Sequence, residues 1–147
     1  YNKQYTAGGD KGLIDGLIGD VDWRKGRWQG YQSQDFEVVI DLKKPMFFDT
    51  IKMGFLQDKR SWIFLPDKIS VYGSEDSVHF EELNIGDYLL DERDLTVGRY
   101  PMVFSGFKKN TSYRYLKVFV KNYGKIPAWH PGAGGDAFIF VDEIEIR

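Results

Sequence analysis

Acidic residues gather in two short segments near the two ends of the chain, where they could hold a hard cation. Asp15 and Gly16 form a tight-turn dipeptide, and Asp20 follows closely enough to point back into the same loop. Calcium binds about six to eight carboxylate and carbonyl oxygens and accepts irregular loops. If this loop meets the C-terminal segment, the Glu143 carboxylate completes the oxygen shell. In the alternative interpretation, Asp15 and Asp20 are ordinary turn residues, because Asp-Gly is a common turn.

Tryptophans placed in polar loops are the second chemical feature. Trp62 follows the polar stretch 57–61, and Trp129 and His130 open a glycine-rich loop, 131–135, whose backbone permits close approach. Sugars place their apolar C–H faces on aromatic rings while neighbouring polar side chains bind the hydroxyls. The pattern therefore indicates a surface for a flat, polyhydroxylated ligand. Alternatively, the tryptophans fill the ends of the core and 131–135 is simply a long turn.

Groups that carry enzymatic chemistry are scarce. The chain has no cysteine, which excludes thiolate catalysis and disulfides, and its two histidines are His79 and His130. The sequence around His79 predicts a solvated turn residue. No nucleophile elbow, zinc-binding His-Glu-x-x-His pair or phosphate-binding loop is present. We therefore expect a protein that is not an enzyme.

Composition narrows the class of partner. A chain of 147 residues matches one domain, and its net charge of -2 argues against nucleic acid. Aromatic residues make up 16% of the chain, so some rings are expected on a binding surface. No apolar run approaches the roughly 18 residues of a membrane span, and no signal peptide is recognisable. Because the chain begins at Tyr1, we interpret it as a mature product or an excised module. The absence of cysteine fits a bacterial secreted or periplasmic protein as well as the cytosol.

The elements that must position these residues are strands. Apolar and polar residues alternate with period two over 36–42, 116–121 and 143–146. No stretch of ten residues has a clear helical period, and 88–94 is at most one helical turn. Trp28 is expected in the core. Turn signals recur at short spacing, so we predict one all-β domain over residues 1–147, an antiparallel sandwich. Shorter strands are predicted at 51–56, 68–72, 80–83 and 99–104.

The order of these motifs resembles the discoidin domain, also called the coagulation factor C-terminal type domain, whose sugar-binding branch is the family 32 carbohydrate-binding modules. The resemblance rests on 13–16 followed by Trp23, on 36–42, on 68–76 and on 142–146. It covers nearly the whole chain and implies an eight-stranded jelly-roll sandwich with a structural calcium ion. The ligands it implies are the side chains of Asp15, Asp20 and Glu143 and the carbonyls of Leu13, Leu17 and Asp142.

Three further segments, 54–58, 61–66 and 129–135, resemble the module at the C-terminus of chitobiase-type β-N-acetylhexosaminidases of gut Bacteroidetes. This resemblance implies a non-catalytic module that brings an attached glycoside hydrolase to glycans in the periplasm, at the outer membrane or outside the cell. Galactose binders of the family carry an Arg and then an Asn in the loop that here holds 57–62. Galactose specificity therefore does not carry over, and we expect a different sugar site. Its residues would be Gln57, Asp58, Trp62, Trp129 and His130.

Two rival functions use the same loops. In one, the loop aromatics pack against the catalytic domain of the same polypeptide and bind no sugar. In the other, Lys59 and Arg60 beside the apolar stretch 62–64 bind a lipid surface without spanning it.

Overall fold

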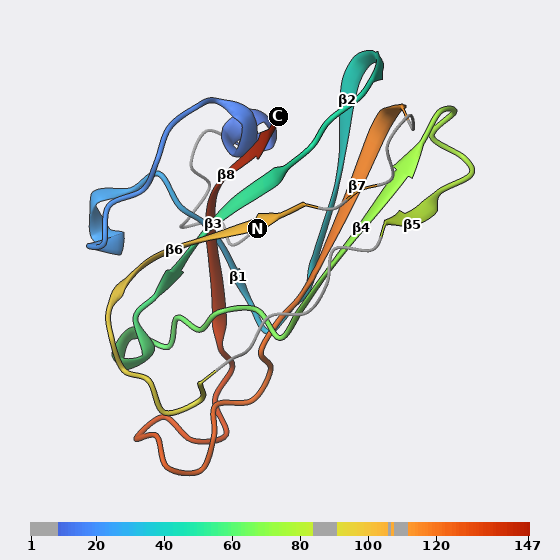
Figure 1. Ribbon diagram of the computed structural model, residues 1–147. Helices are drawn as coiled ribbons and strands as arrows, with labels where there is room; N and C mark the ends of the chain where they lie inside the picture. The colour runs from blue at the N-terminus through green and yellow to red at the C-terminus, as the bar shows by residue number, and fades with distance from the viewer. Residues whose placement is uncertain (1–8, 84–90, 106, 108–111) are drawn as a thin grey trace.

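The computed structural model describes residues 9–83, 91–105, 107 and 112–147, apart from the side chain of Asp10. Its regular elements are eight strands and three short 3-10 helices (Figure 1). The helices are η1 (Gly9–Ile14), η2 (Trp23–Lys25) and η3 (Lys59–Ser61). The strands are β1 (Gln29–Gln32), β2 (Phe36–Met46), β3 (Ile51–Gln57), β4 (Lys68–Ser74), β5 (Glu81–Leu83), β6 (Gly98–Phe104), β7 (Tyr113–Lys121) and β8 (Phe138–Ile146).

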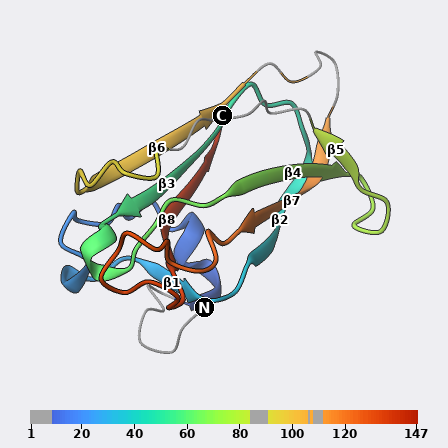
Figure 2. The same ribbon diagram turned by 90° about the horizontal axis from the view of Figure 1, so that it is seen from below.

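The strands form two antiparallel sheets of four. One sheet has the order β1-β8-β3-β6 and the other β2-β7-β4-β5. The two layers are separate in Figures 1 and 2, and η2, η3 and the loop between β7 and β8 gather at one end of them. The predicted all-β antiparallel sandwich is confirmed. Of the predicted helical turn at 88–94, residues 88–90 lie outside the described part of the chain, and the Asp94 N–H donates to the carbonyl of Asp91 in a turn.

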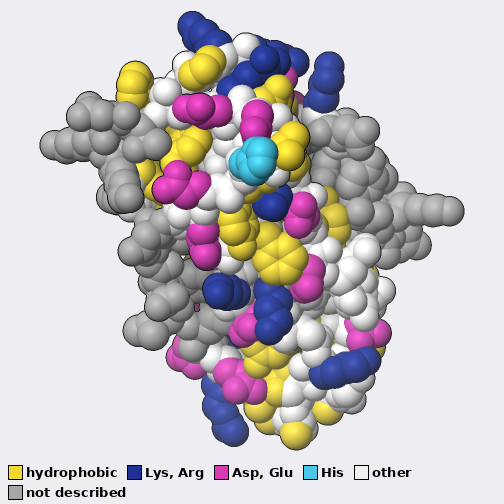
Figure 3. Space-filling view, turned by 90° about the vertical axis from the view of Figure 1, so that its right-hand side faces the viewer, with side chains coloured by type: hydrophobic (Ala, Val, Ile, Leu, Met, Phe, Trp, Pro, Cys, Tyr) yellow, Lys and Arg dark blue, Asp and Glu magenta, His cyan; other side chains and the backbone are white. Residues whose placement is uncertain are grey.

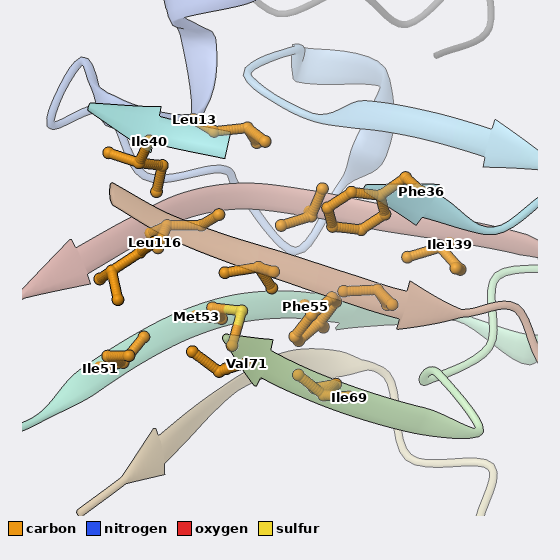
Figure 4. Close-up of a cluster of buried hydrophobic side chains, with 14 of the residues drawn as sticks. Leu13, Phe36, Ile40, Ile51, Met53, Phe55, Ile69, Val71, Leu116 and Ile139 are labelled. Atoms are coloured by element: carbon orange, nitrogen blue, oxygen red, sulfur yellow. The ribbon is translucent and has the colours of Figure 1, made fainter. Parts of the chain in front are cut away.

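Period-two alternation places one face of each strand in the space between the sheets. Ile51, Met53 and Phe55 of β3 are completely buried there, opposite Val71 of β4 and Leu116 of β7 (Figure 4). Each such side chain contributes about 1.5–3 kcal/mol relative to exposure. The core between the sheets therefore supplies most of the stability of the fold.

A second apolar cluster lies on the outer face of the first sheet. Trp28 is 2% exposed and packs there with Leu56, Ile63 and Phe140, as expected for a core residue. Its indole N–H donates to the carbonyl of Asp20 at 2.9 Å. Trp28 thereby attaches the N-terminal loop to the sheet.

His79 lies in the turn between β4 and β5. Its ring nitrogen Nδ1 lies 2.7 Å from the carboxylate of Asp76, which also accepts the backbone N–H groups of Val78 and His79. These contacts hold the pKa of Asp76 below its usual range. The expectation of an exposed turn histidine is confirmed. In the part of the chain that the structure describes, no helix is long and apolar enough to span a membrane.

Candidate functional site

The N-terminal loop meets β8 at the two predicted acidic segments. The Glu143 carboxylate accepts the backbone N–H of Gly16 at 2.9 Å, and the Asp15 carboxylate accepts that of Leu17 at 2.9 Å. Burial, with the nearby charges of Asp15 and Asp142, raises the pKa of Glu143 to about 7, although the Gly16 N–H opposes this shift. Two carboxylates far apart in sequence are therefore brought together, that of Glu143 half-buried and that of Asp15 exposed.

The other predicted metal-site residues have different surroundings. The Asp20 carboxylate accepts the N–H of Asp22 at 2.8 Å and lies 3.8 Å from the Lys25 ammonium. The Leu13 side chain is buried in the core, whereas that of Leu17 is exposed. No group of three or more His, Asp or Glu side chains converges among the described residues. Asp15 and Glu143 are thus the two acidic side chains that the structure associates.

Asp142 has a structural partner that sequence reasoning missed. Its fully buried carboxylate forms a two-pronged ion pair with Arg99, at 2.7 and 3.2 Å, and accepts the N–H of Gly19 at 2.9 Å. The pair lies directly over Gly54 of β3, where a Cβ atom would come within 2.1 Å of the Asp142 carboxylate. Gly54 is therefore required for the contact that joins β6, β8 and the N-terminal loop.

Buried polar side chains organise the loops beyond the end of β3. The Gln57 amide donates to the carbonyls of Asp94 and Thr96, at 3.3 and 2.9 Å, and is 3% exposed. The Lys59 ammonium donates to the carbonyls of residues 91 and 92, at 2.9 and 2.7 Å. Burial lowers the pKa of Lys59, against the opposing charges of nearby carboxylates. Gln57, predicted as a sugar contact, instead holds the loop before β6.

Trp62 and His130 hold the loop between β7 and β8. Trp62 has a left-handed backbone (φ 67°), and its indole lies where a Cβ on Gly132 or Gly135 would come within 2.6–2.8 Å. The buried His130 ring contacts the Lys59 carbonyl through Nε2 at 2.6 Å and accepts the Gly132 N–H through Nδ1 at 2.8 Å. This pairing assigns the ring proton to Nε2. Both side chains therefore support the loop from inside.

Trp129 and Asp58, the other two predicted sugar contacts, are half-buried and have different partners. The Trp129 indole N–H donates to the Glu92 carboxylate at 3.2 Å. Asp58 instead lines an open cavity of about 320 Å³ on the side of η2. The cavity is lined by Val21, Asp22, Trp23, Arg24, Asp58, Ser61 and Val97.

Trp23 supplies the aromatic wall of this cavity. Its indole N–H donates to the Ser61 hydroxyl at 3.2 Å, and that hydroxyl donates to Asp58 Oδ2 at 3.1 Å. The ring packs edge-on against Phe140, with centroids 6.3 Å apart. These contacts fix an aromatic ring and a carboxylate side by side, which is an arrangement that can bind a sugar. The sequence signal was a tryptophan just after the acidic N-terminal turn, but nothing in the spacing joined it to 58–61.

Comparison with solved structures places the fold among family 32 carbohydrate-binding modules. No protein-family model and no curated protein sequence matches the chain. The third such module of a family 31 glycoside hydrolase from Clostridium perfringens has a TM-score of 0.53 and 15% identity, over 99% of this chain and 83% of that one. The AlyQ module, solved with 4,5-unsaturated mannuronic acid, has a TM-score of 0.52 and 11% identity, over 97% and 88%. These likenesses show the fold that the discoidin resemblance implied.

A solved structure from the predicted parent family also matches, but loosely. The C-terminal domain of a Bacteroides fragilis chitobiase is 20% identical over 93% of this chain and 78% of that one, with a TM-score of 0.43. A likeness at this level does not assign a parent enzyme.

Proposed function

We propose that this chain is a non-catalytic carbohydrate-binding module whose sugar site is the cavity beside Trp23. The observation that carries this proposal is the Trp23–Ser61–Asp58 relay, which fixes a ring and a hydrogen-bond acceptor in one cavity. A sugar would lay its apolar face on Trp23 while its hydroxyls donate to Asp58. With one ring and few polar contacts, we expect a Kd of about 0.1–1 mM, which attachment to a larger enzyme makes useful.

The test is a titration of the folded chain with galactose-, N-acetylglucosamine- and N-acetylgalactosamine-terminated oligosaccharides. Trp23→Ala should abolish binding of any ligand found. Phe47→Ala is the matched control, because Phe47 is an aromatic residue that is 68% exposed in the turn between β2 and β3, away from η2. Trp129→Ala distinguishes the cavity from the loop site predicted from sequence. Binding that survives Trp23→Ala but not Trp129→Ala would contradict the proposed location.

Calcium is the second part of the proposal, with a structural role. The side chains of Asp15 and Glu143 fit a hard cation, since both supply carboxylate oxygens and a hydrogen bond joins Glu143 to the backbone of the loop that carries Asp15. The carbonyls of Leu13, Leu17 and Asp142 would complete the site. Asp20 would contribute less, because its carboxylate already bonds within its own turn. The cation would supply positive charge between the N-terminal loop and β8.

We further propose that the module belongs to a chitobiase-like β-N-acetylhexosaminidase that is periplasmic, outer-membrane-associated or extracellular. The support is the sequence resemblance in 54–58, 61–66 and 129–135. Antibodies against this chain should then recover, from cell envelope and medium of the source organism, a polypeptide that hydrolyses a chromogenic N-acetylglucosaminide. Recovery of a protein without that activity would refute this attachment.

Docking onto a catalytic domain is the second candidate, and one surface favours it. On the outer face of the second sheet the Lys117 ammonium lies 4.7 Å from the Tyr72 ring centroid and 4.4 Å from that of Phe80. Figure 3 shows hydrophobic side chains interleaved with charged ones on the side of the molecule that carries this sheet. Tyrosine and phenylalanine are enriched in protein interfaces, although lysine is depleted there. Docking would be supported if the folded module binds no glycan and if Tyr72→Ala weakens its association with the enzyme.

A further inference from the structure

The cavity beside Trp23 is lined by more acidic than basic side chains. Three of its lining residues are ionisable: Asp22, Arg24 and Asp58. Asp22 and Arg24 are committed to each other, because the Asp22 carboxylate accepts Arg24 Nε at 2.8 Å, Nη2 at 3.3 Å and the Arg24 backbone N–H at 3.1 Å. This fork cancels one negative and one positive charge at the rim of the cavity.

Asp58 is the charge that remains. Its contact is with the neutral Ser61 hydroxyl, and within the described residues no cationic side chain lies within ion-pair distance of it. The bonds to Asp22 are the main cause that raises the pKa of Arg24, and the charge of Asp58 adds to this shift. The Arg24 guanidinium lies 6.0 Å from the Trp23 ring centroid. The Ser61 hydroxyl is held in turn by the Trp23 indole, so the carboxylate keeps one orientation. A fixed carboxylate that forms no ion pair within the described residues therefore stands beside an aromatic ring.

We infer that this cavity selects sugars that carry a protonated amine, as glucosamine units do, over their N-acetylated and uronic-acid counterparts. The inference rests on the proposed sugar site. An ammonium group offers several N–H donors and a positive charge to Asp58. An acetamido group offers one neutral donor. A uronate carboxylate brings a second negative charge and is repelled.

The size of the preference follows from the exposure of the cavity. Ion pairs open to solvent stabilise by a few tenths to about 1 kcal/mol, which corresponds to roughly a two- to fivefold change in Kd. We expect the methyl β-glycoside of glucosamine to bind about two- to fivefold more tightly than that of N-acetylglucosamine. The glycoside of glucuronic acid should bind least tightly of the three.

The experiment is a titration, followed by protein NMR, of the folded chain with these three glycosides in mildly acidic buffer, where the amine is protonated. Asp58→Asn keeps the shape of the side chain and should bring the amine and the acetamide to equal affinity. Glu37→Gln is the charge-matched control, since Glu37 is exposed on β2, outside the cavity, and should leave the preference unchanged. Trp23→Ala should weaken all three ligands alike.

The outcomes separate this inference from the function on which it rests. If folded protein binds none of the three glycosides or the oligosaccharide panel, both fall. If sugars bind through Trp23 but the acetamide equals or exceeds the amine, the module stands and the selectivity is overturned. An amine preference that survives in Asp58→Asn overturns the assignment to Asp58. Loss of the preference in Asp58→Asn alone, with an unchanged melting temperature, supports it.

Discussion

Gly54→Ala is the substitution whose effect the structure determines most directly. An added Cβ would lie 2.1 Å from the Asp142 carboxylate and 2.2 Å from the Arg99 guanidinium, far closer than non-bonded atoms allow. One of the charged partners must move, and both are largely buried. Separating a buried ion pair costs about 3–5 kcal/mol, because it leaves charges without compensation. Displacement of Asp142 also removes the acceptor of the Gly19 N–H.

We therefore expect Gly54→Ala to lower the free energy of unfolding by at least about 3 kcal/mol, which for a domain of this size lowers Tm by roughly 6–12 °C. Urea titration and calorimetry measure both quantities. Gly98→Ala is the matched control: it makes the same chemical change on neighbouring β6, where the nearest atom lies 3.6 Å from the new Cβ. Gly98→Ala should change stability by less than about 1 kcal/mol. Equal effects in the two variants would refute the argument from close approach.

Calcium in hundredfold excess over its Kd should raise the stability of the parent by about 2.7 kcal/mol, with a smaller increase in Glu143→Gln; equal calorimetric shifts in both would contradict the proposed site. Gly132→Ala places a Cβ 2.6 Å from the Trp62 indole, so it should destabilise by about 1–3 kcal/mol and shift tryptophan fluorescence; a parent-like Tm and spectrum would contradict this packing. The Arg114 guanidinium lowers the pKa of Asp41 from 3.8 to about 2. The contribution of this lowered pKa to the free energy of unfolding is present above pH 3.8 and is lost as pH falls through about 2. In urea titrations at acidic pH, the free energy of unfolding of Asp41→Asn should therefore fall less steeply with decreasing pH than that of the parent. An equally steep fall in the variant and the parent would refute this role of the Arg114–Asp41 pair.

The strands could be predicted from the sequence because their signal is local. In β3, β7 and β8 the apolar residues face one core, so a period of two is visible without knowledge of any partner strand. The proximity of Asp15 and Glu143 required only that the N-terminal loop reach the last strand. Their hydrogen-bonded geometry matches that expectation. Whether calcium binds there remains a prediction.

The sugar-site residues could be predicted only in part, because their roles depend on long-range contacts. Trp62 occurs in a polar loop, but its left-handed backbone and the space left by Gly132 direct its ring into the protein. Trp23 joins Ser61 across 38 positions of sequence, a contact that no spacing rule reveals. The sequence therefore shows which tryptophans lie in loops. Which of them faces the cavity depends on packing against residues that are distant in the sequence.

Gly54 is a feature of the sequence from which a close contact in β3 could have been predicted. A glycine inside an alternating strand often marks a bulge or a close approach, and the β3–β8 pairing does shift register between Met53 and Phe55. That irregularity is where the ion pair of Arg99 and Asp142 crosses the sheet. The same pair holds Gly19, a few residues before Trp23, so a contact outside the cavity helps to fix its aromatic wall. A module with so few sugar contacts depends on such rigidity, because each group ordered before binding reduces the entropic cost of binding.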